Sequence, residues 1–186
     1  MRSIWPHAIR IYASVWGISA ATLAMVGDVA LEDEWRKTLA LMSLDQLPRA
    51  GNYVRAYIAI AAALSPNPGH GPFQVDFPFQ LNGGRLVPNP PIHEKWTNRF
   101  PADAMDRFEK GFRRLDAIGF DVGTHDQFSH IPAGSRLLSE RLTERGIAHH
   151  FEVYDAGHWD GVGARLRDRI LPFFSETLHR GGSKLR

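Results

Sequence analysis

The spacing of apolar and polar positions divides the chain into predicted strands and helices. Runs of apolar, β-branched and aromatic residues predict buried strands over residues 11–16, 117–122 and 150–154. Apolar residues that recur every three or four positions predict helices over residues 34–42, 52–64, 103–115, 132–146 and 162–178. Pro172 lies inside the last helix, and we expect it to kink that helix or to begin a new segment.

The second half of the chain alternates strand, helix, strand, helix. Consecutive strands joined by a crossover helix pair in parallel, which predicts a layered α/β arrangement. Residues 65–92 are different, because they hold seven prolines and four glycines among several phenylalanines. This composition is too apolar for a disordered linker and predicts an ordered loop region.

Composition narrows the class of protein. The chain has 186 residues, of which 44% are hydrophobic and 23% charged, as in a soluble globular domain. The net charge of +2 is mildly basic, and the basic residues do not form the clustered face of a nucleic-acid-binding protein, so we expect no nucleic acid partner. The chain contains no cysteine, which excludes disulfides, thiolate zinc sites and a cysteine nucleophile.

The N-terminal region permits two interpretations. Arg2 and Arg10 precede an uncharged stretch over residues 11–27, as in a secretory signal. The same stretch also has the pattern of a buried strand and its following loop, which we favour because of Pro6 and His7. The compartment stays open: this interpretation slightly favours the cytoplasm, and export of a full-length parent protein is the alternative. A signal or membrane anchor is thus the alternative for residues 11–27. No other stretch approaches the ~20 apolar residues of a membrane span, so we expect no membrane partner.

Two predicted loops carry candidate chemistry, one after each of the last two strands. Asp126 lies in the first loop and His158 in the second. Neighbouring strand ends lie about 5 Å apart in a sheet, so these side chains can meet. A carboxylate bonded to one imidazole nitrogen fixes the tautomer and orients the other nitrogen as a base. The order acid then histidine is that of α/β-hydrolases, in which the nucleophile comes first.

Simpler explanations of these residues stay open. Asp126 could stabilise a turn, and His158 could be a loop histidine with a structural hydrogen bond. A metal site is another alternative, because histidines and aspartates are frequent in this half of the chain: His125, Asp126, His130, His149, His150, His158 and Asp160. Their spacing matches no established zinc pattern, and we predict no metal and no cofactor.

Ser19 lies in a stretch, GISAA, that is close to the G-x-S-x-G motif of a nucleophile elbow. The helix of an elbow packs deep in the sheet, whereas the residues after Ser19 reach a Gly-Asp break within two turns. The ten residues before the predicted strand also cannot supply the strands that flank an elbow. We therefore expect that Ser19 is not the nucleophile, although that role stays open.

Several segments together resemble the esterase D-like branch of the α/β-hydrolase superfamily, which includes S-formylglutathione hydrolase-type enzymes. The similar segments are TLALMSLDQL (38–47), YIAIAAALSPNP (57–68), FPFQLNGGRLVP (77–88), FDVGTHDQFSHIPAGSRLLSERL (120–142), HHFEVYDAGHWDGV (149–162) and LPFFSETL (171–178). The resemblance implies a serine hydrolase in which Asp126 is the triad acid and His158 the triad histidine. It also implies a three-layer α/β-hydrolase-like sheet with mainly parallel strands.

The resemblance further implies that part of the fold is missing. The stretch YASVWGISAATLAM (12–25) resembles the strand that follows the nucleophile elbow, which places the elbow and the N-terminal strands upstream of Met1. Residues 1–186 are then a single, partial hydrolase domain. Residues 43–105 form a helical, Pro- and Phe-rich insertion near the substrate pocket.

The expected function is therefore carboxylic ester or thioester hydrolysis by a chain that carries acid and base but not the serine. Such a chain is expected to be weak or inactive alone, so its status as an enzyme stays open. Its expected partner is a small-molecule ester, and an exposed sheet edge could support self-association. The alternative is a non-catalytic binding or assembly module, because a fold does not fix a function.

Overall fold

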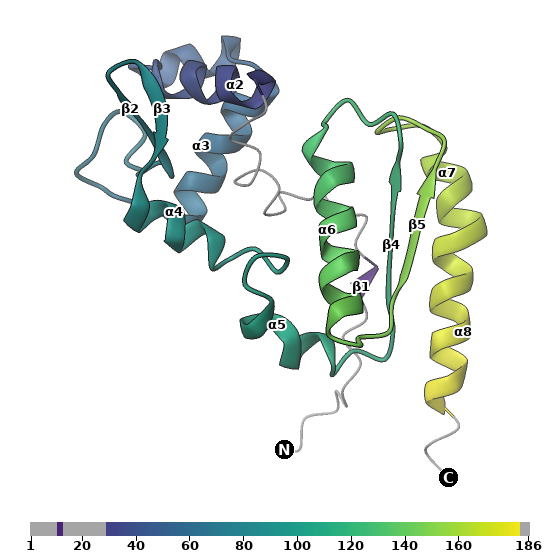
Figure 1. Cartoon of the computed structure of the whole chain (residues 1–186). Helices are drawn as coiled ribbons and strands as arrows, with labels where there is room; N and C mark the ends of the chain where they lie inside the picture. Colours follow the sequence, from purple (N-terminus) through teal and green to yellow (C-terminus); the bar gives the residue numbers. More distant parts are fainter. Residues whose placement is uncertain (1–10, 13–28, 183–186) are drawn as a thin grey trace, which may run out of the picture. The chain divides into compact units, whose positions relative to one another are not determined.

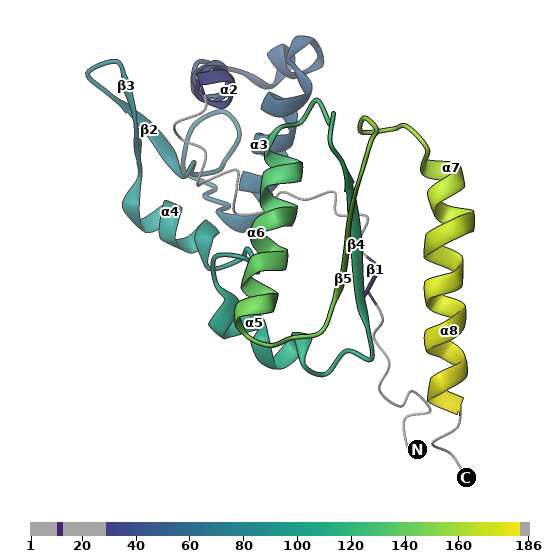
Figure 2. The ribbon, with the colours of Figure 1, turned by 45° about the vertical axis from the view of Figure 1, so that its right-hand side comes forward.

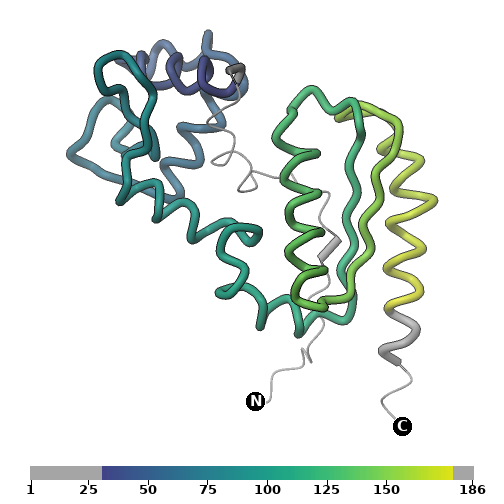
Figure 3. Tube along the Cα trace, viewed as in Figure 1, coloured from purple at the N-terminus to yellow at the C-terminus, as the bar shows by residue number. Residues whose placement is uncertain are grey.

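The structure of the protein is a computed structural model that describes residues 11–12 and 29–182 (Figure 1). Figure 3 follows the same chain as a Cα trace. The chain forms two compact units. The helical unit is Thr22–Ala104, and the sheet unit combines Met1–Ala21 with Met105–Arg186. The insertion expected over residues 43–105 falls in the helical unit except for its last residue.

Aromatic packing forms the core of the helical unit. Helices α2 (Val29–Leu39) and α3 (Asn52–Leu64) are separated by the short 3₁₀-helix η1 (Leu44–Arg49). Trp35 of α2 stacks on Tyr57 of α3 with ring centroids 3.9 Å apart, and both residues are 2% exposed. The rings of Phe79 and Trp96 contact Trp35 edge-on, so one indole joins four segments of this unit.

A β-hairpin occupies part of the region that was expected to be a loop. Strands β2 (Phe79–Asn82) and β3 (Arg85–Pro88) pair in antiparallel orientation, and Pro90 then opens helix α4 (Pro90–Thr97). Gly83 and Gly84 both have positive φ, as the tight turn between hairpin strands requires. The expectation of a loop throughout residues 65–92 was therefore wrong for this part of the chain.

Parallel strands form the sheet of the sheet unit. The strand order is β1 (Ile11–Tyr12), β4 (Ile118–Gly123), β5 (His150–Tyr154), with β4 in the centre. Phe120 is paired with Phe151 and Gly123 with Tyr154, so β4 and β5 end at the same edge. The expected parallel pairing of these two strands is confirmed. Residues 13–16 of the expected first strand lie outside the described residues.

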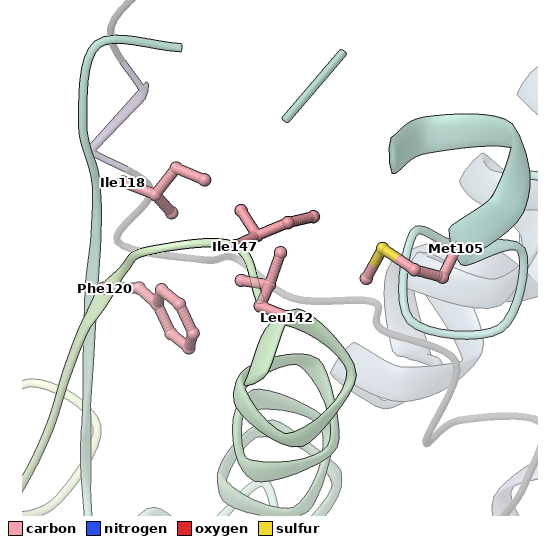
Figure 4. Close-up of a cluster of buried hydrophobic side chains, with 5 residues drawn as sticks. All are labelled: Met105, Ile118, Phe120, Leu142 and Ile147. Atoms are coloured by element: carbon pink, nitrogen blue, oxygen red, sulfur yellow. The ribbon is translucent and has the colours of Figure 1, made fainter. Parts of the chain in front are cut away.

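Helices lie on both faces of this small sheet (Figure 2). Helix α6 (His130–Glu144) crosses from β4 to β5 on one face, and α5 (Met105–Phe112) precedes β4. Figure 4 shows the apolar side chains that join these elements. They comprise Met105, Ile118, Phe120, Leu142 and Ile147, all at most 8% exposed. Burial of this cluster holds α6 against the sheet.

The opposite face of the sheet is covered by the C-terminal helical segment. This segment consists of α7 (Val162–Arg165), the π-helical turn η2 (Leu166–Ile170) and α8 (Leu171–Gly182). Pro172 lies in the first turn of α8, immediately after the π-helical turn. Because proline lacks the N–H that would bond four residues back, it is accommodated where the helical hydrogen-bond pattern changes, here beside the π-helical turn. The backbone of Leu171 is αR, so the helical path continues from η2 into α8, and Pro172 lies at this change of helical type and not after a break.

The expected fold class was wrong. The residues described by the structure form seven α-helices, one small three-stranded parallel sheet and one antiparallel pair. They contain no large, mainly parallel three-layer sheet of the α/β-hydrolase type. The physical reason is that, of the described residues, three short segments pair in parallel, while residues 29–104 pack as helices and a hairpin around their own aromatic core.

Candidate acid–base site

Two loops leave the carboxyl ends of β4 and β5 and are joined by backbone hydrogen bonds. The N–H of Thr124 donates to the carbonyl of Tyr154 at 2.8 Å, and the N–H of His125 donates to that of Ala156 at 2.9 Å. The N–H of Ala156 also donates to the Tyr154 carbonyl at 3.0 Å. The ladder between the strands thus continues into both loops, which fixes their relative position.

Gly123 allows the two loops to approach this closely. A Cβ atom at Gly123 would lie 2.3 Å from the carbonyl oxygen of Ala156, a distance that real Cβ atoms do not show. Since the obstructing atom is backbone, it cannot swing aside as a side chain could. A glycine at the end of β4 is therefore a condition for the observed loop geometry.

Asp126 and His158 meet where these loops converge, as the sequence predicted. Nδ1 of His158 lies 2.8 Å from Oδ2 of Asp126. The other oxygen, Oδ1, accepts the backbone N–H of Phe128 at 2.8 Å, which fixes the carboxylate. An ionised carboxylate can only accept, so His158 donates through Nδ1–H, and the lone pair of the neutral imidazole is then on Nε2.

Burial distinguishes this pair from an ordinary surface contact. The side chain of Asp126 is 4% exposed and that of His158 is 12% exposed. The carboxylate is nearly removed from water, while a small part of the imidazole stays accessible. A hydrogen bond between a charged and a polar group is stronger under these conditions than in water.

Aromatic rings bracket the imidazole of His158. The ring of Phe128 lies edge-on with centroids 4.9 Å apart, and the ring of Trp159 lies edge-on at 4.7 Å. Trp159 itself is 62% exposed, so it brings a large apolar surface next to the accessible part of His158. The two rings restrict rotation of the imidazole and leave proton transfer at Nε2 as the chemistry that this arrangement can perform.

His130 is a further titratable group near the pair. It opens helix α6, and its residue is only 7% exposed. Burial lowers the pKa of His130 below its ordinary value, while the nearby charge of Asp126 acts in the opposite direction. His130 is therefore held neutral near pH 7. From the sequence, His130 was named as a candidate metal ligand and was given no role beside the pair. Its position at a predicted helix start, two residues before Pro132, is the signal that could have located it near Asp126.

The other histidines of this half of the chain do not converge on one point. Nδ1 of His125 pairs with Asp155 at 3.0 Å at an exposed position, and Nε2 of His149 lies 2.7 Å from the hydroxyl of Ser139. Among residues 11–12 and 29–182, no group of three or more histidines and carboxylates is arranged to hold a metal ion. The described residues therefore give no support to the metal alternative.

Ser19 and its GISAA stretch lie outside the described residues, so the structure places neither beside His158. The chain matches no protein-family model, and no curated protein matches its sequence closely enough to count as a relative. Within the part of the chain that the structure describes, no helix is both long and apolar enough to cross a membrane.

Proposed function

We propose that Asp126 and His158 are the acid and base of a serine-dependent hydrolase that cleaves carboxylic esters or thioesters. One observation carries the proposal: the 2.8 Å bond from His158 Nδ1 to a carboxylate that is 4% exposed. This bond selects the tautomer in which Nε2 accepts a proton. The resemblance of residues 120–142 and 149–162 to esterase D-like enzymes adds the expectation that an ester is the substrate.

In the proposed reaction, Nε2 of His158 takes the proton from a serine hydroxyl as its oxygen attacks the substrate carbonyl carbon. The imidazolium then gives this proton to the departing alcohol or thiol, which leaves an acyl-serine ester. A water molecule attacks the carbonyl carbon of that ester as Nε2 takes one of its protons, and the imidazolium then gives this proton to the serine oxygen, so that the acid and the free serine are released. Asp126 holds the imidazole and stabilises its positive charge throughout.

In this proposal the serine belongs to the nucleophile elbow that the resemblance places before Met1. With the chain alone, we therefore expect weak ester hydrolysis or none, because loss of one triad member removes several powers of ten in rate. Ser19 is the other source to be tested, since it lies in a stretch similar to an elbow. Replacement of Ser19 by alanine distinguishes the two sources of the hydroxyl.

Hydrolysis of a short-chain aryl ester and of an acyl thioester tests the proposal. Turnover is measured for the chain alone and for the chain produced together with any polypeptide encoded immediately upstream. We expect turnover in the second preparation that His158→Gln abolishes and Ser19→Ala leaves unchanged. No turnover in either preparation would favour the second hypothesis, a non-catalytic binding or assembly module.

A further inference from the structure

The C-terminal side of the His158 loop is attached to the sheet by very few buried groups. After His158 the chain turns at Gly161, whose φ is 71°, and enters α7. Val162, Gly163 and Ala164 are exposed, and neither α7 nor η2 contains a buried residue. Arg165 is the one residue of the four in α7 that is not exposed, so its side chain has a particular part in fixing this end of the loop.

Arg165 binds the two strands that carry the acid–base site. Its Nε donates to Asp121 of β4 at 2.9 Å, and its Nη1 and Nη2 donate to the two carboxylate oxygens of Glu152 of β5 at 2.9 and 2.8 Å. Asp121 and Glu152 are register partners on the neighbouring strands. The guanidinium therefore separates two like charges that would otherwise face each other across the sheet.

The same guanidinium reaches the residue at which the His158 loop begins. Its carbon lies 4.4 Å from the ring centroid of Tyr154, the last residue of β5. The carbonyl of Tyr154 accepts the N–H of Thr124, which joins the Asp126 loop to β5, and the N–H of Ala156, which lies within the His158 loop. A continuous set of contacts thus runs from Arg165 through Tyr154 to both halves of the site.

We propose that Arg165 is a positioning residue: it fixes β4, β5 and the end of the His158 loop so that His158 Nδ1 stays bonded to Asp126. This inference rests on the proposed function in one respect: the hydrolase reaction is what the His158–Asp126 hydrogen bond would serve. A planar fork with several donors is required, because an ammonium group cannot make paired parallel bonds to Glu152 while it also bonds to Asp121. Lysine at this position keeps the charge and loses the geometry.

Nitrogen-15 NMR of the imidazole groups tests the proposal in the full chain. In Arg165→Lys we expect the His158 Nδ1–H signal to exchange with water severalfold to about tenfold faster, or to be lost, as after loss of one hydrogen bond. Arg167→Lys is the matched control, because Arg167 lies in the same segment, is exposed and bonds to the adjacent Asp168. It is expected to leave the signal unchanged.

A second control separates positioning from general stability. Ile147→Ala removes part of the apolar cluster on the other face of the sheet, so it should lower the melting temperature. It should leave exchange of the His158 proton unchanged well below the melting transition. Equal changes in Ile147→Ala and Arg165→Lys, or a wild-type signal in Arg165→Lys, would overturn the proposal.

A third variant covers failure of Arg165→Lys to fold. Glu152→Gln removes one of the two charges that hold Arg165, and we expect a smaller acceleration of exchange in the same direction. An unchanged signal in a folded Glu152→Gln protein would then reject the proposal. Because the readout requires no substrate, absence of ester hydrolysis would reject the hydrolase and not the role of Arg165.

Discussion

Two of the histidine–aspartate pairs in the described residues, one in each unit, differ in instructive ways. In the sheet unit, His158 and Asp126 are 32 residues apart in sequence and come from loops after neighbouring parallel strands. In the helical unit, His70 and Asp76 are six residues apart in one loop, with Nδ1 2.5 Å from Oδ1. Both pairs use Nδ1 and a carboxylate, so the bond alone does not distinguish them.

Burial and attachment separate the two pairs. The side chain of His70 is 66% exposed and that of Asp76 is 24% exposed, against 12% and 4% for His158 and Asp126. Both carboxylate oxygens of Asp76 also accept hydrogen bonds from the side-chain amide of Asn67, which joins the two sides of its loop. The His70 pair thus closes a loop in contact with water. The His158 pair is held by loops that follow two neighbouring strands and is largely shielded from water.

The largest expected effect concerns hydrolysis. In the preparation that turns over esters, Asp126→Asn should lower the rate by about 10⁴-fold, because the wrong tautomer of His158 is then stabilised. Asp76→Asn is the matched control and should leave the rate unchanged. Initial rates at saturating ester measure both. Equal losses in the two variants would mean that the distinction between the pairs has no catalytic meaning.

The next effect concerns the approach of the two loops. Gly123→Ala should lower the free energy of unfolding by about 3 kcal/mol, since the new methyl group meets a backbone carbonyl. Gly111→Ala in α5 is the control, because a Cβ there meets nothing within 4 Å. Chemical denaturation followed by circular dichroism measures both. A Gly123→Ala protein of wild-type stability would show that the close contact is not required.

A smaller effect concerns acid. Burial depresses the pKa of His130 in the folded chain, so the unfolded chain binds more protons between that pKa and about 6.5. The free energy of unfolding is therefore unaffected by His130 above about pH 6.5. It decreases as the pH falls below that value, by at most about 1.4 kcal/mol per pH unit, because the unfolded chain then binds a proton that the folded chain does not. Denaturation at pH 7.5 and 5.5 tests this. His130→Gln should reduce the pH dependence, and an unchanged dependence would contradict the assignment.

The smallest effect concerns the loop of the helical unit. The hydrogen bond from His70 lowers the pKa of Asp76, so its stabilisation is present above the ordinary pKa of aspartate and is lost as the pH falls through the lowered value. Because His70 is mostly exposed, Asp76→Asn should cost less than about 1 kcal/mol at pH 7. A loss comparable to that in Gly123→Ala would show that this pair is more than a surface contact.

The sequence predicted the local elements and the pair better than the whole fold. Asn52–Leu64 and His150–Tyr154 have the predicted bounds, because their apolar patterns are strong and their ends are marked by Gly51, Ser65 and polar residues. Asp126 and His158 could be brought together from the sequence because parallel neighbouring strands end at one edge. That argument requires only two strands, and it holds whatever else the sheet contains.

The remaining features depend on contacts between distant residues. The hairpin at Gly83 and Gly84 carried a recognisable Gly-Gly signal that the surrounding prolines obscured. The predicted number of strands in the sheet was wrong, because that number depends on which distant segments pair, and local sequence patterns do not encode this pairing. The contacts of Arg165 could not be predicted, because a single arginine in an amphipathic helix has the pattern of a solvated charge. Its bonds to Asp121 and Glu152 appear only when the helix is packed on the sheet.

Labelling by a fluorophosphonate probe, read by intact mass, tests the central claim most directly. The chain is incubated with the probe together with any polypeptide encoded immediately upstream, as wild type, His158→Gln and His70→Gln. We predict that one probe group is attached in wild type and in His70→Gln, and that His158→Gln reacts far more slowly. Absence of labelling in every preparation, or equal labelling in all three, would contradict the assignment of His158 as the base of a serine hydrolase.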